Sequence, residues 1–320
     1  MMLQVRELTT HYMSYKKGVV KAVNNVSFDL DHGDTMALIG ESGCGKSTIA
    51  LSILQVIPPA ARIMGGQILF EGEDLLKKTP KELTKIRGEK ISMILQDPMM
   101  ALNPVFTVGN QIAETLSYHR GLRGDGLMHR IEKLLLEVKI PEPEKRIKQW
   151  PHEMSGGMRQ RIVGAIALSC EPKLIIADEP TTNLDVTIQR QYLDLLKSIQ
   201  HKTGLALLFI THDLGIVAQM CEYVAVMYAG KIVERSPVMD IFDNPAHPYT
   251  EALLQTAFGL KDFEKRVPIS GEPPDLACLP TGCSFYPRCK QVMDICRIKD
   301  PEEISLSSDR SVRCWKHASS

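Results

Sequence analysis

The sequence lacks both a long apolar run and the start of a secretory signal. A membrane-spanning helix needs roughly 18 or more consecutive apolar residues, and no segment of this chain approaches that length. Residues 1–6 lead directly into an alternating strand pattern and lack the apolar core of a signal peptide. We therefore expect a cytosolic protein that reaches a membrane only by docking to a partner.

An excess of either charge is also missing, because Lys and Arg total 38 and Asp and Glu total 38. Nucleic-acid-binding proteins usually concentrate positive charge, so this balance argues against a nucleic-acid partner. The composition is that of an ordinary globular protein, with 44% hydrophobic and 24% charged residues. A length of 320 residues predicts one large domain with an appendage, or two domains.

The hydrophobic pattern predicts an α/β fold. Residues 1–40 alternate apolar and polar positions, which indicates antiparallel strands. Between about 97 and 155, apolar residues recur at helical spacing and predict a mainly helical block. From 156 to 235, helical patterns alternate with solid apolar runs, which are typical of a parallel sheet covered on both faces. Strands are expected at residues 35–39, 67–70, 91–95, 174–177, 206–210 and 223–227.

The most informative motif lies at residues 40–47, where Gly-Glu-Ser-Gly-Cys-Gly-Lys-Ser matches the phosphate-binding pattern GxxxxGK[ST]. Glycines let backbone N–H groups turn towards phosphate oxygens, Lys46 supplies charge to the β- and γ-phosphates, and Ser47 offers a hydroxyl to Mg²⁺. A helix at residues 47–56 would present its N-terminus to the nucleotide. The residues predicted to bind nucleotide here are Gly40, Glu41, Ser42, Gly43, Cys44, Gly45, Lys46, Ser47 and Thr48.

Two acids end the apolar run at residues 174–177. Asp178 is placed to hold Mg²⁺ through water, and Glu179 is placed to orient or deprotonate the water that attacks the γ-phosphate. The alternative is a pair of solvated acids where a strand leaves the core. The phosphate-binding loop in the same chain favours catalysis.

A second glycine-containing loop lies at residues 154–161, Met-Ser-Gly-Gly-Met-Arg-Gln-Arg. Ser155 is suited to cap the helix that follows, while Gly156 and Gly157 permit close approach of a phosphate. At this loop the chain resembles the ATP-binding subunits of ABC transporters, whose signature is LSGGQ. Methionine replaces the first and last residues of that signature.

The resemblance implies roles for further residues. Gln96 matches the glutamine that senses Mg²⁺ and the attacking water, and His212 matches the histidine that contacts the γ-phosphate. Read alone, His212 would be an ordinary histidine at the end of a strand. Residues 183–185, Asn-Leu-Asp, correspond to a loop at the dimer interface, so Asp185 is expected near the nucleotide. The catalytic residues implied are Lys46, Gln96, Glu179 and His212, and their presence implies an active ATPase.

The family resemblance covers about residues 1–260 and implies an ABC-type nucleotide-binding domain. Such a domain has a RecA-like mixed-sheet core, an antiparallel β subdomain and a helical subdomain, here at about 97–155. Residues 261–320 would form a small Cys-rich C-terminal module. In this family an aromatic residue stacks on adenine, a role for which Tyr12 is the first candidate and Tyr15 the second.

Members of this family work as dimers in which each ATP lies between the phosphate loop of one subunit and the Ser-Gly-Gly loop of the other. ATP binding closes the dimer and hydrolysis opens it. The resemblance therefore implies a second ATPase subunit, usually non-identical, two transmembrane permease subunits and an external solute-binding protein. The chain would be a peripheral protein at the cytoplasmic face of the cell membrane.

Cysteine is concentrated near the end of the chain, where five of the eight cysteines follow residue 277. In a reducing compartment such a cluster is more typical of metal binding than of disulfides. Four thiolates suit either a [4Fe–4S] cluster or tetrahedral zinc, and their spacing matches no tight zinc pattern, so the metal stays open. Four ordinary thiols are the remaining alternative, and Cys278 is a spare. The four candidate ligands are Cys283, Cys289, Cys296 and Cys314.

Two segments in the C-terminal part of the chain narrow the choice of family further. Residues 244–250, Asn-Pro-Ala-His-Pro-Tyr-Thr, and 282–289, Gly-Cys-Ser-Phe-Tyr-Pro-Arg-Cys, resemble the C-terminal extension of dipeptide, oligopeptide and nickel importer ATPases. Members related to the dipeptide-permease D subunit carry four cysteines there, which implies a [4Fe–4S] cluster, with a structural role preferred over redox sensing. The expected function is ATP hydrolysis that powers import of dipeptides or oligopeptides. The alternatives are a nickel or other solute importer, a soluble ABC ATPase of DNA repair or translation, and an iron–sulfur regulatory protein.

Overall fold

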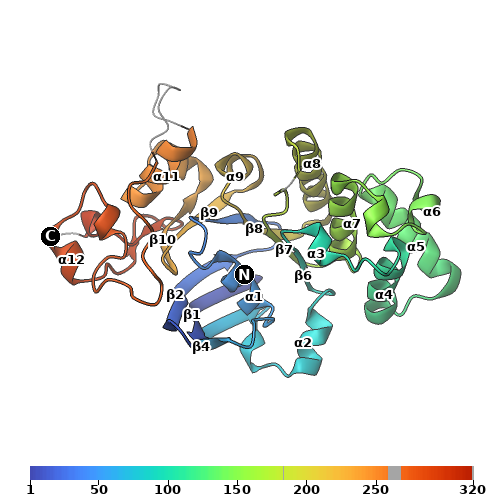
Figure 1. Cartoon of the computed structure of the whole chain (residues 1–320), viewed down its shortest axis with the longest axis horizontal. Helices are drawn as coiled ribbons and strands as arrows, with labels where there is room; N and C mark the ends of the chain where they lie inside the picture. The colour runs from blue at the N-terminus through green and yellow to red at the C-terminus, as the bar shows by residue number, and fades with distance from the viewer. Residues whose placement is uncertain (183, 259–267, 319–320) are drawn as a thin grey trace. The chain divides into compact units, whose positions relative to one another are not determined.

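The computed structural model describes residues 1–182, 184–258 and 268–318 (Figure 1). Contacts within the chain divide it into two compact units. Unit 1 comprises Met1–Lys77 and Phe209–Ser320, and unit 2 comprises Lys78–Leu208. Among the described residues, no helix has the length and apolar character needed to cross a membrane.

An antiparallel sheet forms the first part of unit 1. Its strand order is β2 (Gly18–Leu30), β1 (Leu3–Ser14), β4 (Ala61–Phe70) and β5 (Glu73–Asp74), followed by the short 3₁₀ helix η1 (Leu75–Lys77). β1 pairs with a neighbour on each side, and its residues Leu3, Val5 and Leu8 are fully buried. Alternation along the chain buries one face of the sheet, which confirms the expected antiparallel strands. β4 is longer than the strand expected at residues 67–70.

A second sheet in unit 1 carries the phosphate-binding motif. β3 (Thr35–Ile39) runs parallel to β9 (Tyr223–Tyr228), which pairs antiparallel with β10 (Lys231–Pro237). All five residues of β3 are buried, as expected for an apolar strand covered on both faces. The chain re-enters unit 1 through β8 (Ala206–Ile210). The α-helices of this unit that precede residue 259 are α1 (Lys46–Ile53), α9 (Leu214–Met220), α10 (Val238–Asp243) and α11 (Pro248–Phe258).

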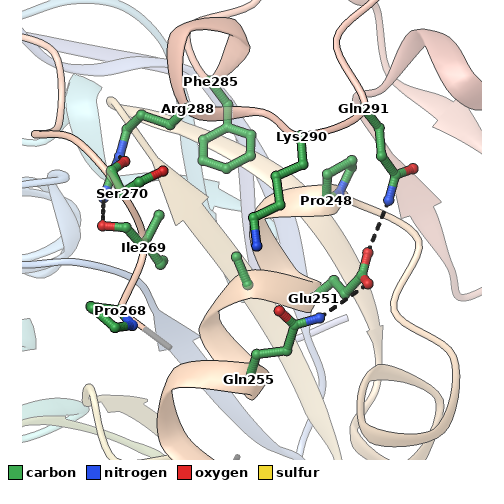
Figure 2. A pocket seen from close by; sticks show the side chains of 11 residues that line it. Pro248, Glu251, Gln255, Pro268, Ile269, Ser270, Phe285, Arg288, Lys290 and Gln291 are labelled. Atoms are coloured by element: carbon green, nitrogen blue, oxygen red, sulfur yellow. Dashed lines mark hydrogen bonds between the residues drawn. The ribbon is translucent and has the colours of Figure 1, made fainter. Parts of the chain in front are cut away.

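The cysteine-bearing tail, described over residues 268–318, belongs to unit 1. β12 (Ser311–Val312) pairs antiparallel with β10, and β11 (Ile304–Ser305) pairs with β12, so the tail extends the sheet. The tail also reaches α11, where Gln291 donates a hydrogen bond to Glu251 at 3.1 Å (Figure 2). The tail is therefore not a distinct compact unit, contrary to the expectation of a separate module. The expected boundary at residue 260 lies among residues 259–267, outside the described part of the chain.

Between residues 268 and 318 the tail contains only short regular elements, as its Pro-, Gly- and Cys-rich composition predicts. Besides β11 and β12, these are η3 (Tyr286–Arg288), α12 (Asp294–Ile298) and η4 (Trp315–His317). An aromatic cluster attaches them to the sheet. The Phe285 ring lies 5.1 Å from that of Tyr228 on β9 and 5.3 Å from that of Tyr249 on α11, measured between centroids. Apolar burial of this kind replaces the core that so small a segment could not form alone.

Unit 2 combines parallel strands with helices. β6 (Ile91–Ile94) pairs parallel with β7 (Leu174–Asp178), next to which β8 lies in the sheet order. Every element between residues 97 and 155 is helical, which confirms the helical pattern there. The helices are α2 (Pro80–Ile86), α3 (Pro98–Ala101), α4 (Val108–Arg120), α5 (Gly124–Glu137), α6 (Pro143–Arg146), η2 (Pro151–Glu153), α7 (Gly156–Leu168) and α8 (Val186–Thr203).

A buried carboxylate orders the chain ahead of α11. Glu234 on β10 is fully buried, and its two oxygens accept the backbone N–H groups of Ala246 and His247, each at 2.8 Å. The tail residue Arg310 lies 3.5 Å from the same carboxylate. Burial lowers the pKa of His247 to about 3, so its ring is neutral at physiological pH, and Nδ1 accepts the Tyr249 N–H at 3.0 Å.

The Glu234→Gln variant should be less stable than the wild type by about 1–3 kcal/mol, because an amide NH₂ would then face a buried N–H donor. Urea or thermal unfolding of both proteins measures the difference. The control is Glu303→Gln, which alters a 40% exposed carboxylate 3.5 Å from Arg313. Exposed pairs contribute about 0–1 kcal/mol. Equal losses in the two variants would contradict a special role for the buried carboxylate.

Candidate nucleotide-binding site

The phosphate loop leaves the end of β3 and enters α1. Gly40 and Gly45 have φ angles of 150° and 109°. A Cβ atom at either position would overlap a backbone carbonyl oxygen, that of Met227 or that of Ala22. Only glycine satisfies both the backbone angle and the lack of space. The loop therefore passes directly into the first turn of α1, whose N–H groups lack partners within the helix.

Lys46 is held inside this loop. Its side chain is buried, and its ammonium group donates to the carbonyl oxygens of Gly40 and Glu41 at 2.8 and 3.0 Å. Ser47 is exposed beside it. If phosphate oxygens took the place of the two carbonyl oxygens, the ammonium group would keep two hydrogen-bond acceptors.

Of the two tyrosines considered for adenine, Tyr12 is the one beside the phosphate loop. Its hydroxyl lies 3.4 Å from Oγ1 of Thr48 in α1, whereas Tyr15 is fully exposed. The geometry thus favours Tyr12 over Tyr15, and stacking on adenine stays a prediction.

His212 follows β8 in unit 1. The preceding residue, Thr211, donates its N–H to the Leu38 carbonyl of β3 at 3.2 Å. The exposed His212 and the phosphate loop therefore both start at the carboxyl ends of adjoining strands, where α/β proteins place their ligands. Asp213 fixes the turn by accepting two backbone N–H groups of α9, at 2.8 and 3.3 Å.

A hollow of about 460 Å³ lies against the phosphate loop and is bordered on its other side by the tail. Tail residues 272–276 line it together with Lys17. Lys17 forms an ion pair with Asp275 at 2.9 Å, and the Lys21 N–H donates to the Leu276 carbonyl at 3.0 Å. Sequence patterns assigned this segment no role, because it has no motif or periodicity of its own.

Unit 2 brings Gln96 and Glu179 together. Gln96 Nε2 donates to Glu179 Oε2 at 2.9 Å, and the hydroxyl of Thr182 donates to the same oxygen at 3.0 Å. Glu179 also has a φ of 45°, a strained angle that costs a non-glycine residue about 1–3 kcal/mol. Such strain is typical of functional positions, and the buried Asp178 precedes it at the end of β7. No sequence pattern marks Thr182 as a functional residue.

The Ser-Gly-Gly loop and Asp185 line a common groove of about 540 Å³ in unit 2. Ser155 caps α7 by accepting the Met158 N–H at 3.3 Å, as expected. Asp185 caps α8 by accepting two N–H groups at 3.1 and 3.0 Å. Gly156 and Gly157 lie between them in the lining, and helix N-termini of this kind attract anions. Asn183 lies outside the described residues.

The four late cysteines are gathered in one part of the tail. Burial raises the pKa of the Cys283 thiol to about 12, and the nearby thiols of Cys296 and Cys314 add to the rise. Burial also raises the pKa of Cys314, to which Cys289 and Cys296 contribute. The Gln291 N–H points at the Cys289 sulfur at 3.4 Å.

Among the described residues, no group of three or more His, Cys, Asp or Glu side chains is arranged to hold a metal ion. Cys278 is exposed.

Known proteins share both the sequence and the fold. Residues 23–182 match the ABC transporter family. The chain belongs to the ATP-binding proteins of ABC transporters. It is 49% identical over 315 residues to the dipeptide transport ATP-binding protein DppD of Bacillus subtilis, covering 98% of this chain and 94% of the relative. Its identity to the oligopeptide transport ATP-binding protein OppD of the same organism is 47%, over 98% and 88% of the two chains.

A solved structure agrees with this assignment. The dimeric ATP-binding cassette MJ0796, bound to ADP and Pi, matches with a TM-score of 0.67 and 26% identity over 74% of this chain and 99% of that one. The protein described here is thus an ABC transporter ATPase. Of the residues predicted for the site, Tyr12, residues 40–48 and His212 lie in unit 1, and Gln96, Ser155, Gly156, Gly157, Asp178, Glu179 and Asp185 lie in unit 2.

Proposed function

We propose that this ATPase powers the import of dipeptides or oligopeptides. Residues 233–296 match the C-terminal region of oligopeptide/dipeptide transporters, and the relatives named above are peptide transport proteins. The match of this C-terminal region carries the proposal, and the region belongs to the same compact unit as the phosphate loop. A nickel or other solute importer is the alternative, because the ATPase subunit of such a transporter does not bind the solute itself.

In the proposed mechanism, ATP places its phosphates on residues 40–47 and its adenine against Tyr12. Lys46 then exchanges two loop carbonyl oxygens for β- and γ-phosphate oxygens, and His212 contacts the γ-phosphate. Ser47, Gln96 and Asp178 offer the oxygen donors that Mg²⁺ prefers, and the ion would neutralise charge on the phosphates.

Glu179 is the proposed group that orients or deprotonates the attacking water. Gln96 and Thr182 support this role, since both donate to one of its oxygens and so fix the side chain. A second ATPase subunit, usually non-identical in this family, would receive the Ser155–Gly157 loop and Asp185 against its own nucleotide. Two transmembrane permease subunits and an external binding protein complete the transporter, and the ATPase lies at the cytoplasmic face of the membrane.

We also propose that Cys283, Cys289, Cys296 and Cys314 hold a [4Fe–4S] cluster, with zinc as the alternative. The mutual proximity of the thiols and the N–H group directed at Cys289 support a sulfur-ligated group, because such hydrogen bonds tune iron–sulfur sites. The role of the cluster would be structural, since metal binding stabilises small segments with little core.

The Glu179→Gln variant should retain ATP binding while its hydrolysis rate falls by about 10²–10⁴-fold, the usual contribution of a general base. An ATPase assay and a nucleotide-binding assay measure the two effects. The matched control is Glu171→Gln, which makes the same change at another unit-2 glutamate with positive φ, paired on the surface with Arg130. An undiminished rate in Glu179→Gln would remove this residue from the mechanism.

Peptide import predicts that the chain co-purifies with its permease partners and that peptide-loaded binding protein stimulates ATP hydrolysis by the reconstituted complex. Stimulation should require the peptide as well as the binding protein, because closure of the ATPase dimer is coupled to delivery of the solute. Nickel and unrelated solutes, each with its own binding protein, serve as controls. Stimulation by nickel but not by peptides would favour the alternative importer.

Anaerobically purified protein should be brown and contain about four iron and four sulfide per chain, as a [4Fe–4S] cluster requires. Metal and sulfide analysis measures this. Cys289→Ser should lose most of the iron, whereas Cys278→Ser should keep it. Stoichiometric zinc without iron would select the alternative, and a chain with neither would show that the thiols are ordinary.

A further inference from the structure

Tail residue Arg288 forms a bidentate salt bridge with Glu41, the second residue of the phosphate loop. Its Nη1 and Nη2 atoms donate to the two carboxylate oxygens of Glu41 at 2.6 and 2.9 Å. The Arg288 side chain is only 4% exposed, so water competes little for the pair. Two parallel charge-assisted hydrogen bonds fix both the distance and the orientation of the partners.

Further contacts hold the guanidinium group in place. Its Nε donates to the Ser270 carbonyl at 3.1 Å, and Nη1 also donates to the Tyr228 hydroxyl at 3.3 Å. The planar group also lies 5.9 Å from the centre of the Tyr228 ring. A lysine at this position would keep the charge but could not make these directed bonds together.

The backbone of Glu41 is anchored as well. Its N–H donates to the hydroxyl of the fully buried Tyr249 of α11 at 2.9 Å. Its carbonyl oxygen accepts the ammonium of Lys46 at 3.0 Å. Glu41 therefore joins the tail and α11 on one side to the phosphate-binding lysine on the other.

We propose that Arg288 is a positioning residue for the phosphate loop, through which the cysteine-bearing tail sets the affinity for nucleotide. Arg288 holds Glu41, and Glu41 holds the loop and Lys46 in the conformation that receives phosphates. Cys283 and Cys289 flank the turn η3 that carries Arg288, so order in the tail is transmitted to the loop. Because coupling between sites is reciprocal, nucleotide at the loop must also stabilise the tail.

The test compares Arg288→Lys with Arg310→Lys in the full chain. Arg310 is another largely buried tail arginine, but its carboxylate partner is Glu234 rather than a loop residue. Arg288→Lys should raise the KM for ATP and the Kd for ADP with Mg²⁺ by about tenfold, within the usual range of coupling between sites, and change kcat by less than about twofold. Arg310→Lys should leave KM and Kd at their wild-type values even if it unfolds at a lower temperature.

Hydrogen exchange supplies a second readout that a merely structural role would not change. ADP with Mg²⁺ should slow exchange of tail amides at residues 283–298 in the wild type, and this protection should be lost in Arg288→Lys. Unchanged KM and Kd in Arg288→Lys, or equal increases in both arginine variants, would overturn the proposal. Protection of the tail amides by ADP that persists in Arg288→Lys would also overturn it.

Glu41→Gln keeps the proposal falsifiable if Arg288→Lys does not fold. The amide retains the shape of the side chain and removes one acceptor of the pair, so it should raise the Kd for ADP in the same direction, and an unchanged Kd would overturn the proposal. The inference rests on the proposed nucleotide site at residues 40–47. Wild-type protein that binds no ADP would refute that site, whereas normal binding that Arg288→Lys leaves intact would refute only the positioning role.

Discussion

Complete burial of three short strands forces the chemistry of this protein to the ends of those strands. Every residue of β3, β7 and β8 is buried, and their polar residues, Thr35 and Asp178, are at strand ends. A polar side chain in the middle of such a strand would have to give up its water. Polar and conformationally special residues therefore appear where each strand leaves the sheet. Gly40 starts the phosphate loop after β3, and Glu179 directly follows β7. His212 lies two positions after the last residue of β8. Burial of the strands thus decides where phosphate, water and metal chemistry is possible.

The parts of the fold that could be predicted from sequence are those with local signals. The strands at residues 35–39 and 206–210 have the bounds that their apolar runs predict. The phosphate loop is recognisable because its glycines are required by backbone angle and space at Gly40 and Gly45. Ser155 is likewise identifiable as a cap, since the hydroxyl needs only the backbone three residues later.

Contacts between distant segments carry no such signal. Arg288 and Glu41 are separated by 247 positions, and each belongs to a motif that gives no hint of the other. β11 and β12 contain two residues each, too few to show alternation, so the tail resembled an independent module although it extends the sheet. The hydrogen bond by which Thr182 fixes Glu179 could not be predicted for a related reason. A hydroxyl three residues along a turn becomes meaningful only once the turn's geometry is known.

The groups proposed to act on the nucleotide are hydrogen-bonded within the protein. Lys46 donates to two loop carbonyl oxygens, and Glu179 accepts from Gln96 and Thr182. This arrangement avoids the cost of a buried ammonium without partners and holds a strained Glu179 backbone in place. In the proposed mechanism ATP must therefore replace existing bonds rather than fill unsatisfied ones. The net free energy of nucleotide binding then depends on how firmly the loop is already ordered. Because Arg288 fixes the loop, less of the interaction energy with the phosphates is spent on ordering it, and more is available to close a dimer.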